Sequence, residues 1–333
     1  MFWTTLIALF AGAEALPQGF GGGNRVTMLR FGCAQVVIDR IDPLVNPGQI
    51  PSPHVHQMVG GNGFNVSMPH TDVSELASCT TCQFSENFSN YWTANLYFKA
   101  RNGTYKRVPQ GGAALQFNDQ FSTQINGGVL VYYVSADPGK ITAFKPPDSG
   151  SMQYPRHKTG IRMLVGDPNM CSRPNTKLKR QNCYRCYTGP NFGGDTGAPC
   201  QDDKVDTEAL PSKPCPGGIR SNIHFPTCWD SKNLDSPNHQ DYGAYPTSGP
   251  ATFLSLGGSC PSTHSVRIPQ LIYEVKGDSL QKAIDTAGCI GAKYATLKTQ
   301  KIEDTRKYAV KKLAKEDYNG LRLTKLPGVD MPM

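Results

Sequence analysis

Apolar and polar residues alternate along several short stretches of this chain, and such alternation predicts strands. Two further runs, at 129–134 and 161–166, are more continuously apolar and also predict strands. Asn102-Gly103 predicts a hairpin turn, whereas the polar, cysteine-rich residues 167–216 favour a loop with little regular sheet. The predicted strands span residues 26–41, 91–100, 105–108, 129–134, 161–166, 219–226 and 267–275.

The pattern changes after residue 275, where apolar residues recur at helical spacing. One helix is expected to begin at 278–281, and a second to span 302–317. Strands first and helices last predict a mainly β protein: a single large antiparallel β-sandwich or jelly-roll-like domain with disulfide-rich loops and a short C-terminal helical appendage. The expected segments are a signal peptide at 1–15, a Gly-rich lead-in at 16–27, the β domain at 28–275 and a helical tail at 276–333.

The composition fits a protein of short strands and turns, because 34 Gly and 26 Pro are spread along 333 residues of which only 18% are charged. The formal net charge is +8, with its clearest excess of lysine at 276–325. A solvated basic tail explains this excess, and affinity for acidic surfaces or acidic polysaccharides is the alternative. No nucleotide fingerprint or nucleic-acid-binding motif is present, so we expect no nucleic-acid partner. We expect a monomer.

The N-terminus predicts export. Residues 2–13 are apolar but too few to span a bilayer, and Ala13-Glu14-Ala15 is a typical signal-peptidase site. No later run of 18 apolar residues follows, so we expect no transmembrane span. We therefore predict a secreted protein, extracellular or associated with the cell wall. Three sequons agree with export and predict N-glycans at Asn65, Asn87 and Asn102.

The cysteines support the same compartment. An oxidising environment predicts that most of the 11 form disulfides, and the odd count leaves one thiol without a partner. The alternative, zinc knuckles at Cys79-x-x-Cys82 and Cys183-x-x-Cys186, is disfavoured by the signal peptide. Sequence alone leaves the pairing open.

The first candidate site is the stretch 51–68. Two prolines favour an extended backbone, and in an extended backbone the side chains of His54 and His56 point to the same face. The glycine-rich residues 60–63 that follow allow close backbone approach or positive φ. A catalytic or sugar-binding role, a metal site and an inert pair of hydrogen-bonded histidines are the alternatives.

The second candidate site is a loop that follows the strand at 219–226. It carries Asp230, Lys232, Asp235 and His239 within ten residues. Carboxylate, amine and imidazole groups together can transfer protons or hold a hydroxylated ligand. A hydrogen-bonded loop rich in Asp and Asn is the structural alternative.

Several blocks of the sequence carry a family resemblance: residues 31–68, 79–82, 91–92, 107–109, 144–146, 162–167, 213–220, 225–230, 233–237, 260–264 and 267–270. They resemble DUF1996, a domain of unknown function common in secreted fungal proteins. This resemblance implies a single large β-rich domain and fungal secretion, and it implies no activity. It also implies a further segment, with a His-Gly-Asp-Tyr run and a Phe-Gly-Trp ending, which is missing between Val275 and Lys276.

Three functions fit these features. The leading one is a lyase or glycoside hydrolase acting on a cell-wall or biomass polysaccharide, with a histidine as base, an aspartate orienting it, and a basic residue neutralising a substrate carboxylate. It needs no cofactor, and it requires residues 51–63 and 228–239 to meet. The second is a non-catalytic glycan- or wall-binding protein that uses Asn, Asp and aromatic residues such as Trp92. The third is a copper or zinc site at His54, His56 and His239. The candidate catalytic residues are His54, His56, Asp230, Lys232, Asp235, His239 and Arg267.

Overall fold

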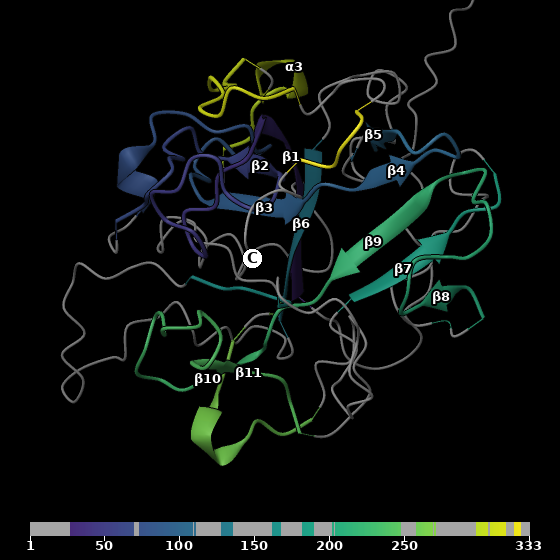
Figure 1. The fold of residues 1–333 in the computed structure, drawn as a ribbon. Helices are drawn as coiled ribbons and strands as arrows, with labels where there is room; N and C mark the ends of the chain where they lie inside the picture. Colours follow the sequence, from purple (N-terminus) through teal and green to yellow (C-terminus); the bar gives the residue numbers. More distant parts are fainter. Residues whose placement is uncertain are drawn as a thin grey trace, which may run out of the picture.

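Antiparallel sheets with very little helix make up the described part of the fold (Figure 1). The structure is a computed structural model. The expectation of a mainly β, disulfide-bonded antiparallel fold is therefore confirmed. The structure describes residues 27–69, 73–108, 110, 128–135, 162–167, 182–189, 202, 204–247, 258–268, 270, 298–305, 307–317 and 323–327.

A four-stranded sheet with the order β3-β2-β1-β6 forms the centre of the fold (Figure 1). Its longest strand, β1, pairs with β6 through residues 27–34 and with β2 through residues 35–39. A β-bulge between Gln35 and Val37 separates these halves and lets Val36 and Val37 pack into one apolar cluster. The strands are β1 (Thr27–Asp39), β2 (His56–Gly60), β3 (Asn90–Ala94) and β6 (Gly128–Ser135).

This central sheet curls into a half-barrel. At one end Gln110 joins the two edge strands, because its side chain donates to Ala94 O at 3.1 Å and its backbone oxygen accepts from Gly128 N at 2.9 Å. Farther along, the hydroxyls of Tyr91 on β3 and Tyr133 on β6 meet at 3.2 Å. The sheet therefore curls toward the face that carries these two tyrosines.

Each face of the sheet packs its own apolar cluster. On the inside of the curl, Phe31 contacts the rings of Phe84, Tyr91 and Tyr133. On the outside, Trp92 packs edge-on against Phe64 with ring centroids 5.7 Å apart. Trp92 therefore takes part in side-chain packing on this face, and the sugar stacking considered above stays a prediction.

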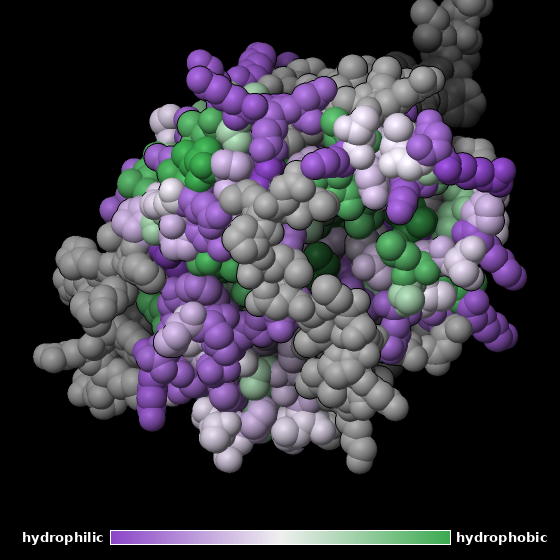
Figure 2. All heavy atoms as spheres, viewed as in Figure 1, coloured by the Kyte–Doolittle hydropathy of each residue, from purple (hydrophilic) through white to green (hydrophobic). Residues whose placement is uncertain are grey.

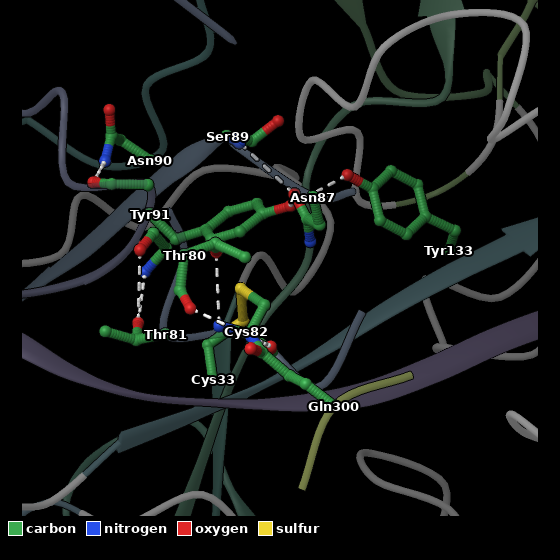
Figure 3. The surroundings of a disulfide bond; sticks show 12 residues. Cys33, Thr80, Thr81, Cys82, Asn87, Ser89, Asn90, Tyr91, Tyr133 and Gln300 are labelled. Atoms are coloured by element: carbon green, nitrogen blue, oxygen red, sulfur yellow. Dashed lines mark hydrogen bonds between the residues drawn. A yellow bond between two sulfur atoms is a disulfide. The ribbon is translucent and has the colours of Figure 1, made fainter. Parts of the chain in front are cut away.

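Three disulfides join cysteines within the described ranges: Cys33–Cys82, Cys186–Cys215 and Cys228–Cys260. Cys33–Cys82 is fully buried and ties β1 to the turn that holds the first Cys-x-x-Cys motif (Figure 3). Each Cys-x-x-Cys motif contributes a cysteine to a disulfide, so neither is a zinc knuckle. Cys79 is a free thiol whose pKa is raised by burial.

Three smaller antiparallel sheets lie around the central one (Figure 1). The hairpin predicted at Asn102-Gly103 is confirmed by the pairing of β4 with β5, with Gly103 at φ +82° in the turn. The predicted strand at 219–226 corresponds to β9. The strands are β4 (Tyr97–Lys99), β5 (Tyr105–Arg107), β7 (Asn182–Cys186), β8 (Asp206–Thr207), β9 (Ile219–Ile223), β10 (Cys228–Trp229), β11 (Gly243–Ala244) and β12 (Val266–Arg267).

One local prediction is wrong, and a second is only partly right. Residues 162–167 form no strand; instead, Arg162 N and Leu164 N donate to the backbone oxygens of Leu234 and His239 in the second candidate loop. The segment 167–216 contains strand β7, which pairs with β9 along its whole length. The sequence of β7 is mostly polar, so its hydrophobic pattern does not predict a strand. Arg185 within β7 is buried and forms an ion pair with Asp206 at 2.6 Å.

The helix predicted over 302–317 is also wrong, because α3 covers only Ile302–Thr305. The following residues lie along the edge of β1 that β6 leaves free, where Val310 N donates to Val36 O at 3.1 Å. Val310 packs on the outside cluster, whereas Ala314 packs with Ile38 and Val55. These two residues are four apart, a spacing typical of a helix, but in the structure they pack into two separate clusters and not along one helix face.

Several expectations lie outside the described residues: the signal peptide at 1–15, the lead-in at 16–26, the first C-terminal helix at 278–281 and the junction of Val275 with Lys276. None of the helices in the described ranges has the length and apolar character needed to cross a bilayer. On the face shown in Figure 2, hydrophilic residues dominate the described surface and hydrophobic ones form smaller groups between them.

Candidate functional site

The two histidines of the first stretch lie side by side, with ring centroids 6.3 Å apart. His56 begins β2 and is buried, and its Nδ1 lies 3.2 Å from Ile41 O. Its Nε2 lies 3.8 Å from Asp42 Oδ2, while the other oxygen of Asp42 accepts from the N–H groups of the following turn. His54 is partly exposed and Ser52 donates to its backbone oxygen.

Burial lowers the pKa of His56, because a charged imidazole is poorly solvated inside the fold. The nearby Asp42 carboxylate and the Ile41 carbonyl oppose this shift but do not overcome it. His56 is therefore neutral at pH 7, and its buried ring suits a structural contact better than an exchange of protons with a large substrate.

The glycines at 60–63 provide close backbone packing. A Cβ on Gly60 would lie 1.9 Å from Ser89 O, and one on Gly61 would lie 2.3 Å from Phe88 O. Asn62 fastens the next turn, because its Oδ1 accepts from the N–H groups of Ser78 and Cys79. Gly60 and Gly61 thus allow the expected close backbone approach, to the residues just before β3, and Asn62 fixes the turn at Ser78–Cys79.

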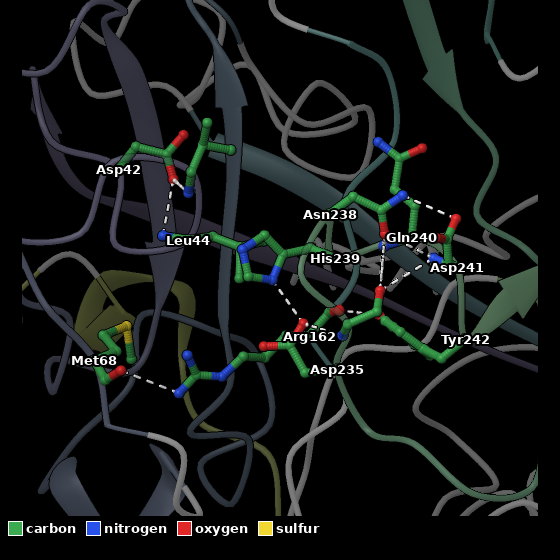
Figure 4. A network of polar contacts seen from close by, with 12 residues as sticks. Asp42, Leu44, Met68, Arg162, Asp235, Asn238, His239, Gln240, Asp241 and Tyr242 are labelled. Carbon is green, nitrogen blue, oxygen red and sulfur yellow. Dashed lines mark hydrogen bonds and ion pairs between the residues drawn. The ribbon is translucent and has the colours of Figure 1, made fainter.

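The second stretch contains a hydrogen-bonded carboxylate–imidazole pair. His239 Nδ1 lies 2.6 Å from Asp235 Oδ1, and both side chains are partly exposed (Figure 4). An ionised carboxylate accepts only, so Nδ1–H donates and Nε2 carries the free lone pair. His239 has φ +56°, an uncommon conformation outside glycine. The loop therefore holds this imidazole in one defined orientation.

The other charged residues of this loop have different roles. Asp230 accepts from the N–H groups of Lys232 and Asn233 and from the Asn233 side chain, as in an Asx-type turn. Partial burial raises its pKa, but these hydrogen bonds outweigh burial and hold the pKa below its ordinary value. Lys232 is exposed, and Arg267 on β12 donates to Gly258 O. Asp230 thus acts as part of a hydrogen-bonded turn, which is the structural alternative considered for this loop.

Arg162 connects the two stretches on which the site depends (Figure 4). Its guanidinium donates to Met68 O at 3.1 Å and to Pro69 O. Its backbone N–H donates to Leu234 O at 3.1 Å, and its backbone oxygen accepts from the Tyr242 hydroxyl. Sequence reasoning assigned Arg162 to a strand, so it was not among the candidate site residues.

This bridge joins the loop to residues 68–69, not to the histidine pair. Within the described residues, neither His54 nor His56 makes a hydrogen bond or ring contact with His239. No group of three or more His, Cys, Asp or Glu side chains in those ranges is arranged to hold a metal ion. We therefore build the function on the Asp235–His239 pair, and the role of the His54–His56 pair stays a prediction.

The three sequons differ in exposure, and this predicts which can carry a glycan. Asn65 and Asn102 are exposed, whereas Asn87 is fully buried and its Oδ1 accepts from Ser89 N and Tyr91 OH (Figure 3). A glycan on Asn87 would break these contacts, so glycopeptide mapping of the folded chain, expressed through a secretory pathway, should find sugar at Asn65 and Asn102 only. Occupancy of Asn87 in folded protein would contradict this packing.

The described molecule is thus a disulfide-bonded antiparallel β protein with an oriented Asp–His pair on a surface loop. Its sequence matches one family model, described as a domain of unknown function (DUF1996), over residues 42–288. Because this match covers more than half of the chain, the protein belongs to the DUF1996 family, as its sequence blocks predicted. No curated protein and no solved structure shows significant similarity to it.

Proposed function

We propose that this protein is secreted and acts on a cell-wall or biomass polysaccharide, with His239 as general base and Asp235 as its orienting partner. The observation that carries this proposal is the 2.6 Å contact between His239 Nδ1 and Asp235 Oδ1. A carboxylate in this position selects the tautomer that leaves Nε2 basic. The three disulfides support secretion, since such bonds persist in oxidising compartments.

Two reactions fit this base. In a lyase, Nε2 removes a C–H proton next to a uronate carboxyl group, the electron pair forms a C=C bond, and the glycosidic oxygen leaves and takes a proton from water. In a hydrolase, Nε2 removes a proton from a water that attacks the anomeric carbon, the glycosidic C–O bond breaks, and the leaving oxygen takes a proton from water. Lys232, exposed on the same loop, and Arg267 are the basic residues proposed to neutralise a substrate carboxylate.

Replacing His239 tests this assignment. The full chain is incubated with polyuronates and with neutral glucans, and new reducing ends and unsaturated ends are measured. His239→Ala should lower turnover about 10²- to 10⁴-fold, the range for a lost general base. Asp235→Asn should lower it less, because Nε2 remains but its tautomer is no longer selected.

Asp241→Asn is the matched control, because Asp241 is an exposed carboxylate of the same loop that contacts Asn238 rather than His239. It should turn over substrate like the parent chain. Turnover that survives His239→Ala would contradict the proposal. Binding of a polysaccharide without turnover by the parent chain would favour the second candidate, a non-catalytic glycan-binding protein, which the buried amide groups described next also support.

A further inference from the structure

Among the described residues, seven carboxamide side chains have buried polar atoms that make no hydrogen bond, and four of them are Gln35 on β1, Gln57 on β2, Asn95 just after β3 and Gln110 beside β6. In these four, the atoms are Oε1 of Gln35, Gln57 and Gln110, and both Oδ1 and Nδ2 of Asn95. We call these four residues the carboxamide layer. Buried polar atoms are nearly always hydrogen-bonded in native proteins, so five without a partner in one region call for a ligand or for ordered water.

Two members of the layer, Gln57 and Gln110, are joined through a short chain of hydrogen bonds that ends beside a third, Asn95. Gln57 Nε2 donates to Gly128 O at 3.0 Å, and Gly128 N donates to Gln110 O at 2.9 Å. Gln110 Nε2 then donates to Ala94 O at 3.1 Å, next to Asn95. The layer therefore lies where the edges of the curled sheet meet.

The layer faces the inside of the curl. Gln57 and Val59 are two residues apart on β2, so their side chains point to the same face. Gln35 pairs directly with Val59 and shares that face. Both glutamines therefore point toward the apolar cluster around Phe31. Asn95 extends the β3 ladder by donating to Val55 O at 2.9 Å, two residues after Thr93, which pairs with Gln57. The layer thus separates the cluster around Phe31 from the small cluster of Ile38, Val55 and Ala314.

The hydrogen-bond pattern defines the ligand chemistry. The Nε2 atoms of Gln57 and Gln110 are fixed by backbone oxygens, so their Oε1 atoms are acceptors that need a donor. None of the four side chains is charged, so the layer offers no neutralisation to a bound cation or anion. Hydroxyl groups, which donate and accept, match four unpaired oxygens and one unpaired amide nitrogen. Gln35, Asn95 and Gln110 are partly exposed, so the layer lies near the surface, although its five unpaired atoms are themselves buried.

We propose that the carboxamide layer is a binding site for one saccharide unit of a neutral glycan, held by hydroxyl-to-amide hydrogen bonds. Mouths of curled sheets and barrels commonly hold ligands in this way. This site uses none of the residues of the Asp235–His239 pair. It goes beyond the proposed function, because it binds sugar whether or not that pair is catalytic.

Titration of the ¹⁵N-labelled full chain tests the proposal. The probes are soluble oligosaccharides of glucose, mannose and N-acetylglucosamine, and the readouts are affinity by calorimetry and the side-chain NH₂ resonances of the layer. At least one probe should bind and shift the resonances of Gln57, Gln110 and Asn95. Gln35→Ala and Asn95→Ala should each weaken binding about tenfold, the effect of one or two lost hydrogen bonds, without unfolding the chain.

Asn90→Ala is the matched control. Asn90 also has a buried Oδ1 without a partner and an Nδ2 that donates to a backbone oxygen, but it precedes Tyr91 and so lies on the opposite face of β3. This variant should bind the probe normally, and so should His239→Ala, which separates this site from the catalytic proposal. Absence of binding by every probe, a response to calcium chloride alone, equal weakening by Asn90→Ala, or a crystal soaked with probe that shows only water in the layer would overturn it.

Discussion

Gly60→Ala is expected to lower the free energy of unfolding by about 3–5 kcal/mol, which is a large part of the stability of an ordinary domain. Gly60 has φ +106°, a conformation that residues with a Cβ rarely adopt, and an added Cβ would lie 1.9 Å from Ser89 O. The added methyl group must push the backbone of β3 away from β2, and β3 carries Tyr91, which belongs to the apolar cluster around Phe31. Thermal unfolding should show a midpoint lower by about 10 °C.

Gly218→Ala separates the two causes of this loss. Gly218 has a similar φ of +95°, but a Cβ there would meet no heavy atom within 4 Å. It should therefore cost only the backbone strain, about 1–2 kcal/mol. If both variants unfold at the same temperature, the contact with Ser89 is not the reason for glycine at position 60.

Asp39→Ala is expected to release the segment 307–317 and to destabilise the chain by about 3 kcal/mol. Asp39 is fully buried, and its carboxylate accepts from the N–H groups of Arg40, Leu313 and Ala314. Removing the carboxylate leaves these donors without their acceptor. Because Lys311 is exposed in this segment, limited trypsin digestion should cut there faster in the variant than in the parent chain.

Asp304→Ala is the control for this prediction. Asp304 is an exposed carboxylate near the same segment, paired with Lys307 at 2.5 Å. Exposed pairs contribute little to stability, so neither the unfolding midpoint nor the cleavage rate should change. An Asp39→Ala chain cleaved as slowly as the parent would show that the segment is held without Asp39, by Arg40 Nη1, which donates to both carboxylate oxygens of Glu316, and by the bond of Val310 N to Val36 O.

The local sequence pattern was sufficient to predict a strand where apolar and polar residues alternate and the strand ends in a recognisable turn. Strand β1 and the hairpin at Asn102-Gly103 are of this kind. It failed where a partner distant in sequence decides the structure. Strand β7 forms because β9 pairs with it, and residues 307–317 are not helical because β1 and Asp39 take up their N–H groups.

The candidate site was predictable to a similar degree. The density of charged residues between Asp230 and His239 marked the right loop, but only the folded loop selects Asp235 as the partner of His239 and engages Asp230 in a turn. Arg162 could not be found from periodicity, because its role depends on contacts with Met68 and Leu234, each about 70 or more residues away in sequence. The carboxamide layer likewise appears only after the sheet curls.

The contact of residues 310–316 with β1 has a consequence for synthesis of the chain. Strand β1, the first strand in the described residues, is completed by residues made more than 270 positions later. Until they emerge, the backbone groups of Val36 and the Asp39 carboxylate have no partner from this segment, and one edge of β1 is open to pairing with other chains. A nascent chain stalled before residue 310 should therefore aggregate or engage chaperones more than one released after residue 317.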